Sequence, residues 1–326
     1  MTADEIKAQL PPRIAERVRS VRVNGDVATV VADAGGLSRD NAAGLQRDLE
    51  GLVGGLAGIA QVRVALMADK VRRRIVAIGS GKGGVGKSTL TANLAVALAR
   101  AGRKVGVVDA DIYGPSQPVL LGAADAKPTA EGQTLNPVAS PWGVTMLSMG
   151  QLVAPGKAIA WRGPMTGSAL GQLMDAAWGD AELLLVDLPP GTGDVQLTML
   201  QKFKPDGAIV VSTPQDLALI DATRALDLFR QAGVPVVGLV ENMAGYVCPH
   251  CGELSDPFGE GGVEAAARAM GEAFLGRVPL SLAVRKASDA GHPPAAGDGA
   301  DGEAFAAVAD HLAAWLDAQA AHGGAA

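Results

Sequence analysis

The sequence has few cysteines, few aromatic residues and no long apolar run. Two cysteines among 326 residues exclude a disulfide framework. With 48% apolar but only 3% aromatic residues, a sizeable core must consist mainly of Ala, Val, Leu and Ile. No segment reaches about 18 unbroken apolar residues, so none is expected to span a membrane. The chain is long enough for one large domain, or for one large and one small domain.

Basic charge is scarce as well. The chain has 28 Lys and Arg against 34 Asp and Glu, for a net charge of −6. The densest basic run, "KVRRR" at Lys70–Arg74, is typical of a solvated boundary before a buried strand, so nucleic acid is not an expected partner. The opening residues "MTADEIKAQLPPR" are charged and have no apolar stretch of the signal-peptide type. We therefore expect a cytoplasmic protein that binds neither nucleic acid nor a membrane.

Residues 1–68 predict a small α+β domain with a ββαβ-like order. Apolar and polar residues alternate on both sides of the Asn24–Gly25 turn, which is typical of a β-hairpin. A helical pattern follows, with Ser38 and Asp40 as possible caps, and a third strand comes after it. The expected elements are a hairpin over Ser20–Ala34, a helix from Asn41 to about Leu56 and a strand over Ala60–Leu66.

Residues 69–326 predict one α/β domain with a doubly wound, mostly parallel sheet. Short apolar runs alternate with helical patterns, and strands that are apolar on both faces belong to a parallel sheet covered by helices on both sides. Ligands of such folds bind at the carboxyl ends of the strands. A long loop or loose hairpin is expected over Gly122–Gly143, a surface loop over Ser288–Ala304 and an amphipathic helix over Glu303–Ala320. The strand candidates are "IVAIGS", "KVGVVDA", "VTMLSM", "LLLVDL", "AIVVST" and "VVGLVEN".

The stretch "GSGKGGVGKST", Gly79–Thr89, has the pattern of a phosphate-binding loop. Its segment Gly81–Ser88 satisfies G-x-x-x-x-G-K-[ST] between a predicted strand and a predicted helix. Glycines allow backbone N–H groups to surround phosphate oxygens, and the helix N-terminus adds partial positive charge. Lys87 is expected on the outer phosphates and Ser88 Oγ on Mg²⁺. The expected nucleotide-binding residues are Gly81, Gly83, Gly84, Val85, Gly86, Lys87, Ser88 and Thr89.

Three carboxylates are candidates for catalysis beside this loop. Asp109 and Asp111 end the second strand of the domain, in "VGVVDADIYGPS". Asp187 ends the apolar run of "LLLVDLPPGTGD", as the metal-linked acid of P-loop nucleotidases does. Gly191 and Gly193 would let the loop after Asp187 move as a switch that senses the γ-phosphate. An ordinary structural role at a strand end is the alternative for Asp187 and, more strongly, for Asp109.

The stretch "YVCPHCGE" contains both cysteines, Cys248 and Cys251. Two thiolates leave half of a tetrahedral site empty, and His250 is a poor ligand inside so tight a turn. The other histidines lie far away in the sequence. A symmetric dimer would supply four cysteines around its two-fold axis, a ligand set that suits either [4Fe–4S] or Zn²⁺.

The phosphate loop resembles that of the deviant-Walker ATPases, K-G-G-x-G-K-[ST], here Lys82–Ser88. The resemblance implies that Lys82 reaches across a dimer interface to the partner's phosphates, which is the role of an arginine finger supplied in trans. It also implies that Asp111 orients the attacking water and that Asn242, in "VENM", holds the adenine. Lys82, Lys87, Asp111 and Asp187 are therefore the expected catalytic residues.

Over about residues 74–320 the chain resembles the Mrp/ApbC-type iron–sulfur cluster carriers. The matching stretches are "GSGKGGVGKST", "DADIYGPS", "WRGPM", "VDLPPGTGDVQLT" and "ENMAGYVCPHCG". The resemblance implies an ATPase with Mg²⁺ whose homodimer binds a labile [4Fe–4S] cluster through Cys248 and Cys251. A cluster donor would load it, and ATP would control transfer to apo-proteins. Residues 1–68 resemble the domain that often precedes this ATPase only weakly, and they lack its occasional cysteine.

Four other classes share parts of this pattern. A MinD/ParA-like positioning ATPase predicts a basic terminal helix or a basic face, whereas the helix predicted at the carboxyl end has no Lys or Arg. A zinc-bridged targeting ATPase would have the same cysteine pair and a Met-rich groove, but the nine Met here are scattered. A nitrogenase-iron-protein-like reductase needs two well-separated cysteines. A thiol–disulfide oxidoreductase needs the pair at a helix start in a thioredoxin-like unit.

Overall fold

The computed structural model describes residues 2–35, 37, 39–67, 73–112, 114–132, 134–152 and 164–323. The chain divides into two compact units, Met1–Arg72 and Arg73–Ala326, whereas the sequence predicts the boundary between residues 68 and 69. Several predicted features lie outside the described residues. They are Ser38, the side chain of Asp40, residues 70–72 of the basic run and the first three residues of "WRGPM".

The N-terminal unit is a three-stranded sheet with one long helix. β1 and β2 are antiparallel and meet at a turn where Gly25 has a φ of 63°. β3 returns parallel to β2 after α3, which buries Leu45, Leu49 and Val53 against the strands. The predicted order of two strands, a helix and a strand agrees with this arrangement. The elements are α1 (Ala3–Ala8), α2 (Pro12–Ala15), β1 (Val18–Asn24), β2 (Val27–Asp33), α3 (Arg39–Gly54) and β3 (Gln61–Met67).

Within the described part of the second unit, nine strands form one sheet. Its order is β13-β12-β11-β4-β10-β5-β9-β8, and β14 also pairs with β12. Only β8 and β13 pair antiparallel, so the predicted mostly parallel sheet is confirmed. The strands are β4 (Arg74–Gly79), β5 (Val105–Asp109), β8 (Val138–Ala139), β9 (Thr145–Ser148), β10 (Leu183–Asp187), β11 (Gly207–Ser212), β12 (Val236–Val247), β13 (Leu254–Ser255) and β14 (Phe274–Leu280).

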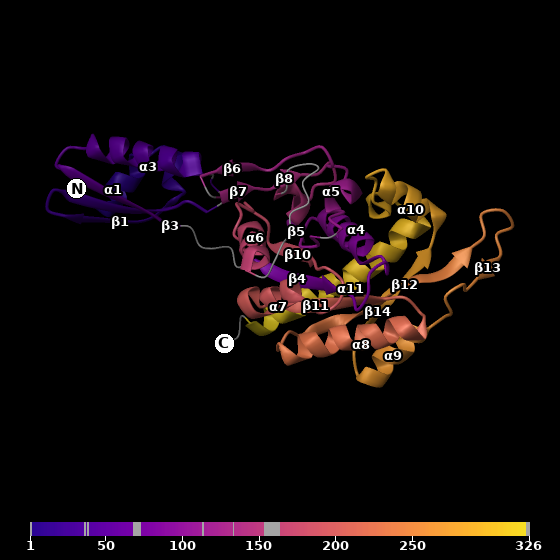
Figure 1. Ribbon diagram of the computed structural model, residues 1–326. Coiled ribbons are helices and arrows are strands. Elements are labelled where there is room, and N and C mark those ends of the chain that lie inside the picture. Colours follow the sequence, from indigo (N-terminus) through magenta and orange to yellow (C-terminus); the bar gives the residue numbers. More distant parts are fainter. Residues whose placement is uncertain are drawn as a thin grey trace. The chain divides into compact units, whose positions relative to one another are not determined.

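Helices cover both faces of this sheet, because successive side chains of a strand point to opposite faces. Ile78, Val107 and Leu185 pack with α4, α10 and α11, while the adjacent Ala77, Val108 and Val186 pack with α6 to α9 (Figure 1). No helix in the described ranges has the length and apolar composition needed to cross a bilayer. The helices are α4 (Lys87–Arg100), α5 (Gln117–Leu120), α6 (Pro164–Met174), α7 (Asp194–Thr198), α8 (Asp216–Gln231), α9 (Gly262–Met270), α10 (Leu282–Asp289) and α11 (Ala300–Gly323).

The two stretches that the sequence predicts as irregular differ in outcome. Gly122–Gly143 contains a small antiparallel hairpin of β6 (Thr129–Glu131) and β7 (Thr134–Asn136), as expected. The surface loop predicted over Ser288–Ala304 is wrong in part, because α10 extends into it and α11 begins within it. Between these helices Ala295 is buried, and its N–H donates to Asn93 Oδ1 at 2.9 Å.

Candidate functional site

The phosphate loop joins β4 to α4 and has the backbone that its glycines predict. Gly84 and Gly86 have φ values of 79° and 83°, in the left-handed region that favours glycine. A Cβ atom on Gly86 would lie 2.0 Å from Asn242 Nδ2, so no larger residue fits without movement. The 14 residues of α4 begin directly after Gly86, and their first N–H groups can bind an anion.

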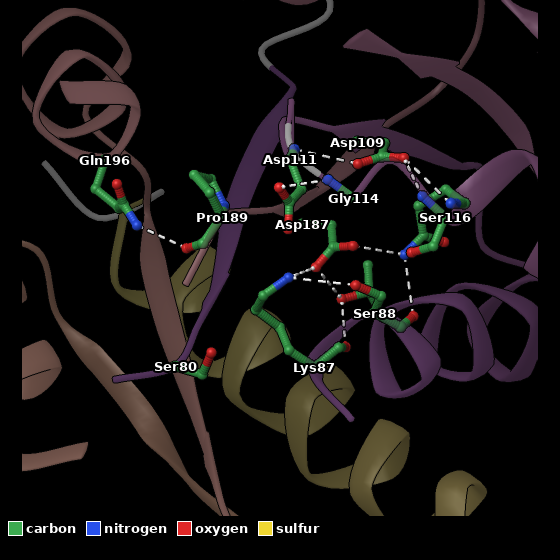
Figure 2. Close-up of polar contacts among 12 residues, drawn as sticks. Ser80, Lys87, Ser88, Asp109, Asp111, Gly114, Ser116, Asp187, Pro189 and Gln196 are labelled. Atoms are coloured by element: carbon green, nitrogen blue, oxygen red, sulfur yellow. Dashed lines mark hydrogen bonds and ion pairs between the residues drawn. The ribbon is translucent and has the colours of Figure 1, made fainter. Parts of the chain in front are cut away.

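Lys87 and Asp187 form a buried ion pair at the base of this loop (Figure 2). Lys87 Nζ lies 2.5 Å from Asp187 Oδ1 and 3.3 Å from Ser88 Oγ. Asp187 is fully buried and Lys87 is 5% exposed. The structure thus brings the predicted phosphate lysine, the predicted Mg²⁺ ligand and the predicted acid into one cluster.

Gln117, which the sequence analysis missed, completes this cluster from the start of α5. Its Nε2 donates to Asp187 Oδ2 at 2.8 Å and to the Ser88 carbonyl oxygen at 3.0 Å. In the part of the chain that the structure describes, Gln117 Oε1 is buried and has no hydrogen-bond partner. The available signal was weak, because a glutamine six residues after Asp111 belongs to no motif that we recognised.

Asp109 organises the loop that follows β5. Burial, and next the charge of Asp187, raise the pKa of Asp109 from 3.8 to about 7, although its hydrogen bonds act in the opposite direction. This arrangement favours the structural alternative for Asp109. Its carboxylate accepts hydrogen bonds, at 2.9 to 3.2 Å, from the N–H groups of Asp111, Ser116 and Gln117 and from Ser148 Oγ.

Asp111 lies beside this cluster, whereas the Lys82 ammonium does not reach it. Asp111 is 9% exposed, and its Oδ1 accepts a hydrogen bond from the Gly114 N–H at 3.2 Å. Lys82 is half-buried, and its backbone oxygen accepts from Ser80 Oγ at 3.0 Å. Among the described residues its ammonium has no hydrogen-bond or ion-pair partner. The two lysines of the loop therefore have different environments.

The switch candidate, the loop after Asp187, is held by a second residue that the sequence analysis missed. Gln196 Nε2 donates to the carbonyl oxygens of Pro189 at 2.6 Å and of Gly191 at 3.0 Å. Gln196 is buried at the start of α7, and Figure 2 shows its side chain pointing to Pro189. The loop therefore has a defined conformation whose release would break two hydrogen bonds.

Asn242 connects the phosphate loop to β12, the strand that leads into the cysteine turn. It lies on β12 and donates from Nδ2 to the Val85 carbonyl oxygen at 2.7 Å. The residue predicted to hold adenine therefore contacts the phosphate loop itself. Cys248 follows only six residues further along the chain.

The cysteines lie in a hairpin that extends β12 beyond the sheet (Figure 1). Tyr246 and Val247 pair with β13, and the Cys248 N–H donates to the Glu253 oxygen at 2.9 Å. Cys248 is half-buried and Cys251 is exposed.

The environment of Cys248 favours its thiolate form. Hydrogen bonds, first from the His250 backbone and then from Cys251, lower the pKa of Cys248 below its ordinary 9.0. Within the described ranges no group of three or more His, Cys, Asp or Glu side chains is arranged to hold a metal. One chain therefore offers a metal or cluster two accessible sulfur ligands at this hairpin.

Comparison with known proteins identifies relatives of the second unit. The family model described as ParA, NUBPL iron-transfer P-loop NTPase, matches residues 71–313. A Deinococcus radiodurans protein named iron-sulfur cluster carrier protein is 52% identical over 225 residues, 68% of this chain and 63% of that protein. The chain thus matches less than two thirds of that relative. A Pseudomonas fragi protein with the same name is 48% identical over 241 residues, 73% of this chain and 83% of that protein.

Solved structures give the same result for the fold. A nucleotide-binding protein from Archaeoglobus fulgidus, in complex with ADP and with cobalt found, has a TM-score of 0.60 and 40% identity, covering 67% of this chain and 86% of that one. The Pyrococcus furiosus cell division ATPase MinD, with a TM-score of 0.55 and 23% identity, covers 74% of this chain and 99% of its own, and it supports the fold alone. The predicted resemblance to iron–sulfur cluster carriers is confirmed, and this chain belongs to the NUBPL iron-transfer P-loop NTPase family.

Proposed function

We propose that this protein is an ATP-binding and ATP-hydrolysing carrier that receives an iron–sulfur cluster and passes it to apo-proteins. The observation that carries the proposal is an accessible cysteine hairpin on the strand whose Asn242 contacts the phosphate loop. The names of the relatives support the cargo, since those proteins are called iron-sulfur cluster carriers. We assign the activity to the cytoplasm, where a reducing environment keeps such thiols free.

The residues of the loop fit ATP with Mg²⁺. The left-handed glycines and the N-terminus of α4 can donate backbone hydrogen bonds to phosphate oxygens. Gln117 Oε1 is a buried acceptor that could receive a hydrogen bond from a metal-bound water. Bound Mg²⁺ would neutralise phosphate charge. Lys87 would then exchange part of its pairing with Asp187 for the outer phosphates, while Asp111 orients the attacking water. The proposed binding residues are Gly81, Gly83, Gly84, Val85, Gly86, Lys87, Ser88, Thr89 and Asn242, with Ser88 Oγ and Asp187 on the metal side.

We propose that the working form is a homodimer that holds one [4Fe–4S] cluster between two hairpins. One chain supplies Cys248 and Cys251, and a cubane cluster takes four thiolates, so a second copy completes the ligand set. Val247 and Leu254 flank the cysteines with 59% and 65% of their surface exposed, and the second copy would cover them. Closure on ATP would also bring the Lys82 ammonium to the partner's phosphates.

Residues 1–68 remain a proposed separate domain in this scheme, and residues 69–326 the proposed ATPase domain. The N-terminal unit has its own core and no cysteine. We assign it a role in protein contact or dimer support, and all cluster ligands to the ATPase domain.

The test is anaerobic reconstitution followed by iron and sulfide analysis, a visible spectrum and a solution mass. We expect about four iron and four sulfide per dimer. Cys248→Ala should abolish the cluster, and Lys82→Ala should retain it but lose ATP-dependent transfer to an apo-protein. A colourless dimer with one Zn²⁺ would refute the carrier function and favour a zinc-bridged targeting ATPase. A metal-free monomer would refute the shared site.

A further inference from the structure

The backbone of β12 is strained at Met243. Its φ is 59°, in the left-handed region that side chains disfavour, and it is one of two non-glycine residues with positive φ among those described. Gly245 has a φ of 72°, and the pairing of β12 with β14 shifts register between Asn242 and Tyr246. The strand is thus divided into a core half and a hairpin half, and Met243 lies at the division.

The core half of β12 contacts the phosphate loop, and the hairpin half leads to the cysteines. On the core side, Asn242 Nδ2 bonds the Val85 oxygen at 2.7 Å, and Met243 Cε would lie 3.9 Å from a Cβ atom on Gly86. On the other side, the strand leads into the hairpin with Cys248. Residue 243 therefore lies between the part of β12 that contacts the phosphate loop and the part that leads to the cysteines.

We infer that Met243 is a positioning residue through which nucleotide in the phosphate loop changes the position of the cysteine hairpin. This inference rests on the proposed function and names a route for its coupling. The left-handed conformation of a methionine is unfavourable in free energy, and such a conformation persists only where the surrounding structure fixes it.

Nucleotide would change the hydrogen bond of the residue next to Met243, which joins Asn242 to the phosphate loop. Phosphates would fill the loop beneath Met243, and a base bound by Asn242 would compete with the Val85 oxygen for the Asn242 amide. With that hydrogen bond lost, residue 243 can leave the left-handed region, and the hairpin then moves relative to the sheet. Cluster binding that fixes the hairpin would in turn change nucleotide affinity, because such coupling is reciprocal.

Substitutions at residue 243 separate strain from side-chain contact. Met243→Gly removes the penalty for positive φ, since glycine adopts both signs equally well. Met243→Ala keeps the penalty and removes the thioether. The matched control is Lys204→Gly. Lys204 is the other left-handed residue among those described, with a φ of 45°, and it lies shortly before the first residue of β11, so glycine there removes a comparable backbone strain elsewhere in the fold.

The measurement is the rate at which a small maleimide alkylates the cysteines of apo-protein, with and without ATP and Mg²⁺. The chain has only these two cysteines, so the signal is unambiguous. Nucleotide should change the wild-type rate at least about 5-fold. Met243→Gly should reduce that ratio to near one, whereas Met243→Ala and Lys204→Gly should keep it. A fluorescent ATP analogue verifies that every variant binds nucleotide.

Three outcomes would overturn the inference: no nucleotide effect in the wild type, a retained effect in Met243→Gly, or a lost effect in Met243→Ala. The alkylation rate is measured on protein without a cluster, so it can refute the coupling whether or not the carrier function is correct. Nucleotide-dependent alkylation in a protein that binds no iron would refute the carrier and leave the coupling intact. A protein that binds the cluster but whose alkylation does not depend on nucleotide would refute the coupling and leave the carrier function intact.

Discussion

Lys87 Nζ and Asp187 Oδ1 lie 2.5 Å apart, and both side chains are buried. Lys87 therefore has a buried counter-ion within the chain itself. Gln117 donates to the other carboxylate oxygen of Asp187, so both oxygens are satisfied. The ion pair places the Lys87 ammonium 3.3 Å from Ser88 Oγ.

Replacing Lys87 by Met should destabilise the protein without nucleotide, because it leaves the buried Asp187 charge without its counter-ion. We expect the free energy of unfolding to fall by about 3 kcal/mol, measured by urea denaturation without nucleotide. Lys82→Met is the matched control from the same loop and should change it by less than about 0.5 kcal/mol. Both variants should lose ATP hydrolysis. Equal stability losses in the two variants would contradict the assigned pairing.

Asp109 predicts a specific pH dependence of stability. Its pKa is raised from 3.8 to about 7, so the folded chain keeps a proton that the unfolded chain has lost. Unfolding then releases this proton between pH about 4 and about 7, and the free energy of unfolding falls as pH rises through that window. Asp109→Asn should remove this fall.

The measurement is urea denaturation of wild type and variant at several pH values in that range. Asp180→Asn, whose side chain is 76% exposed, serves as the control and should leave the wild-type slope unchanged. A wild-type slope retained in Asp109→Asn would show that another group releases the proton.

The elements that the sequence predicted best are those with a continuous local signal. β4 and α4 lie where the sequence predicts a strand before the glycine loop and a helix after it. β14 was not predicted, because "FLGRVPL" contains Gly276, Arg277 and Pro279 and lacks an unbroken apolar run. Arg277 is tolerated there since its guanidinium pairs with the buried Glu241 at 2.9 Å. That compensation comes from the neighbouring strand β12, which is remote in the sequence, so the residues around Arg277 do not indicate it.

The residues of the site also divide into those that a local sequence pattern indicates and those that it does not. Lys87, Ser88 and Asp187 belong to motifs and meet in space as motifs require. Gln117 belongs to none, and its role appears only when the fold brings the start of α5 within hydrogen-bond distance of Asp187 at the end of β10. The hydrogen bond between Asn242 and Val85 likewise joins residues 157 positions apart. Contacts of this kind depend on the sheet order, which apolar runs alone do not determine.

Gly86 should be irreplaceable in the phosphate loop, whereas Gly83 should tolerate alanine. Alanine at 86 is strained by the positive φ and would clash with Asn242 Nδ2 at 2.0 Å. A Cβ atom on Gly83 would meet Pro190 at 3.7 Å, an ordinary contact. We expect Gly86→Ala to lower the free energy of unfolding by at least about 1 kcal/mol and to abolish ATP binding.

Urea denaturation and titration with a fluorescent ATP analogue measure both effects. Gly83→Ala should fold with wild-type stability, to within about 0.5 kcal/mol. Tight nucleotide binding by Gly86→Ala would mean that the loop adopts another backbone when it is occupied.

Gln117 should affect the metal requirement of hydrolysis through the groups that it holds. Gln117→Leu removes the donor to Asp187 Oδ2 and to the Ser88 oxygen, which leaves the buried Asp187 Oδ2 without that hydrogen bond. The free energy of unfolding should fall by about 1 to 3 kcal/mol. The Mg²⁺ concentration for half-maximal hydrolysis should rise about 10-fold or more, as for other residues that orient metal ligands.

Gln151→Leu is the matched control for this substitution. Gln151 also makes two hydrogen bonds, with the Ser148 N–H at 3.0 Å and the Ala126 oxygen at 3.1 Å, but neither partner belongs to the Lys87–Asp187 cluster. The control should lose comparable stability and keep the wild-type Mg²⁺ dependence. Equal shifts of the Mg²⁺ requirement in both variants would mean that general loosening of the domain, rather than the Asp187 contact, causes the effect.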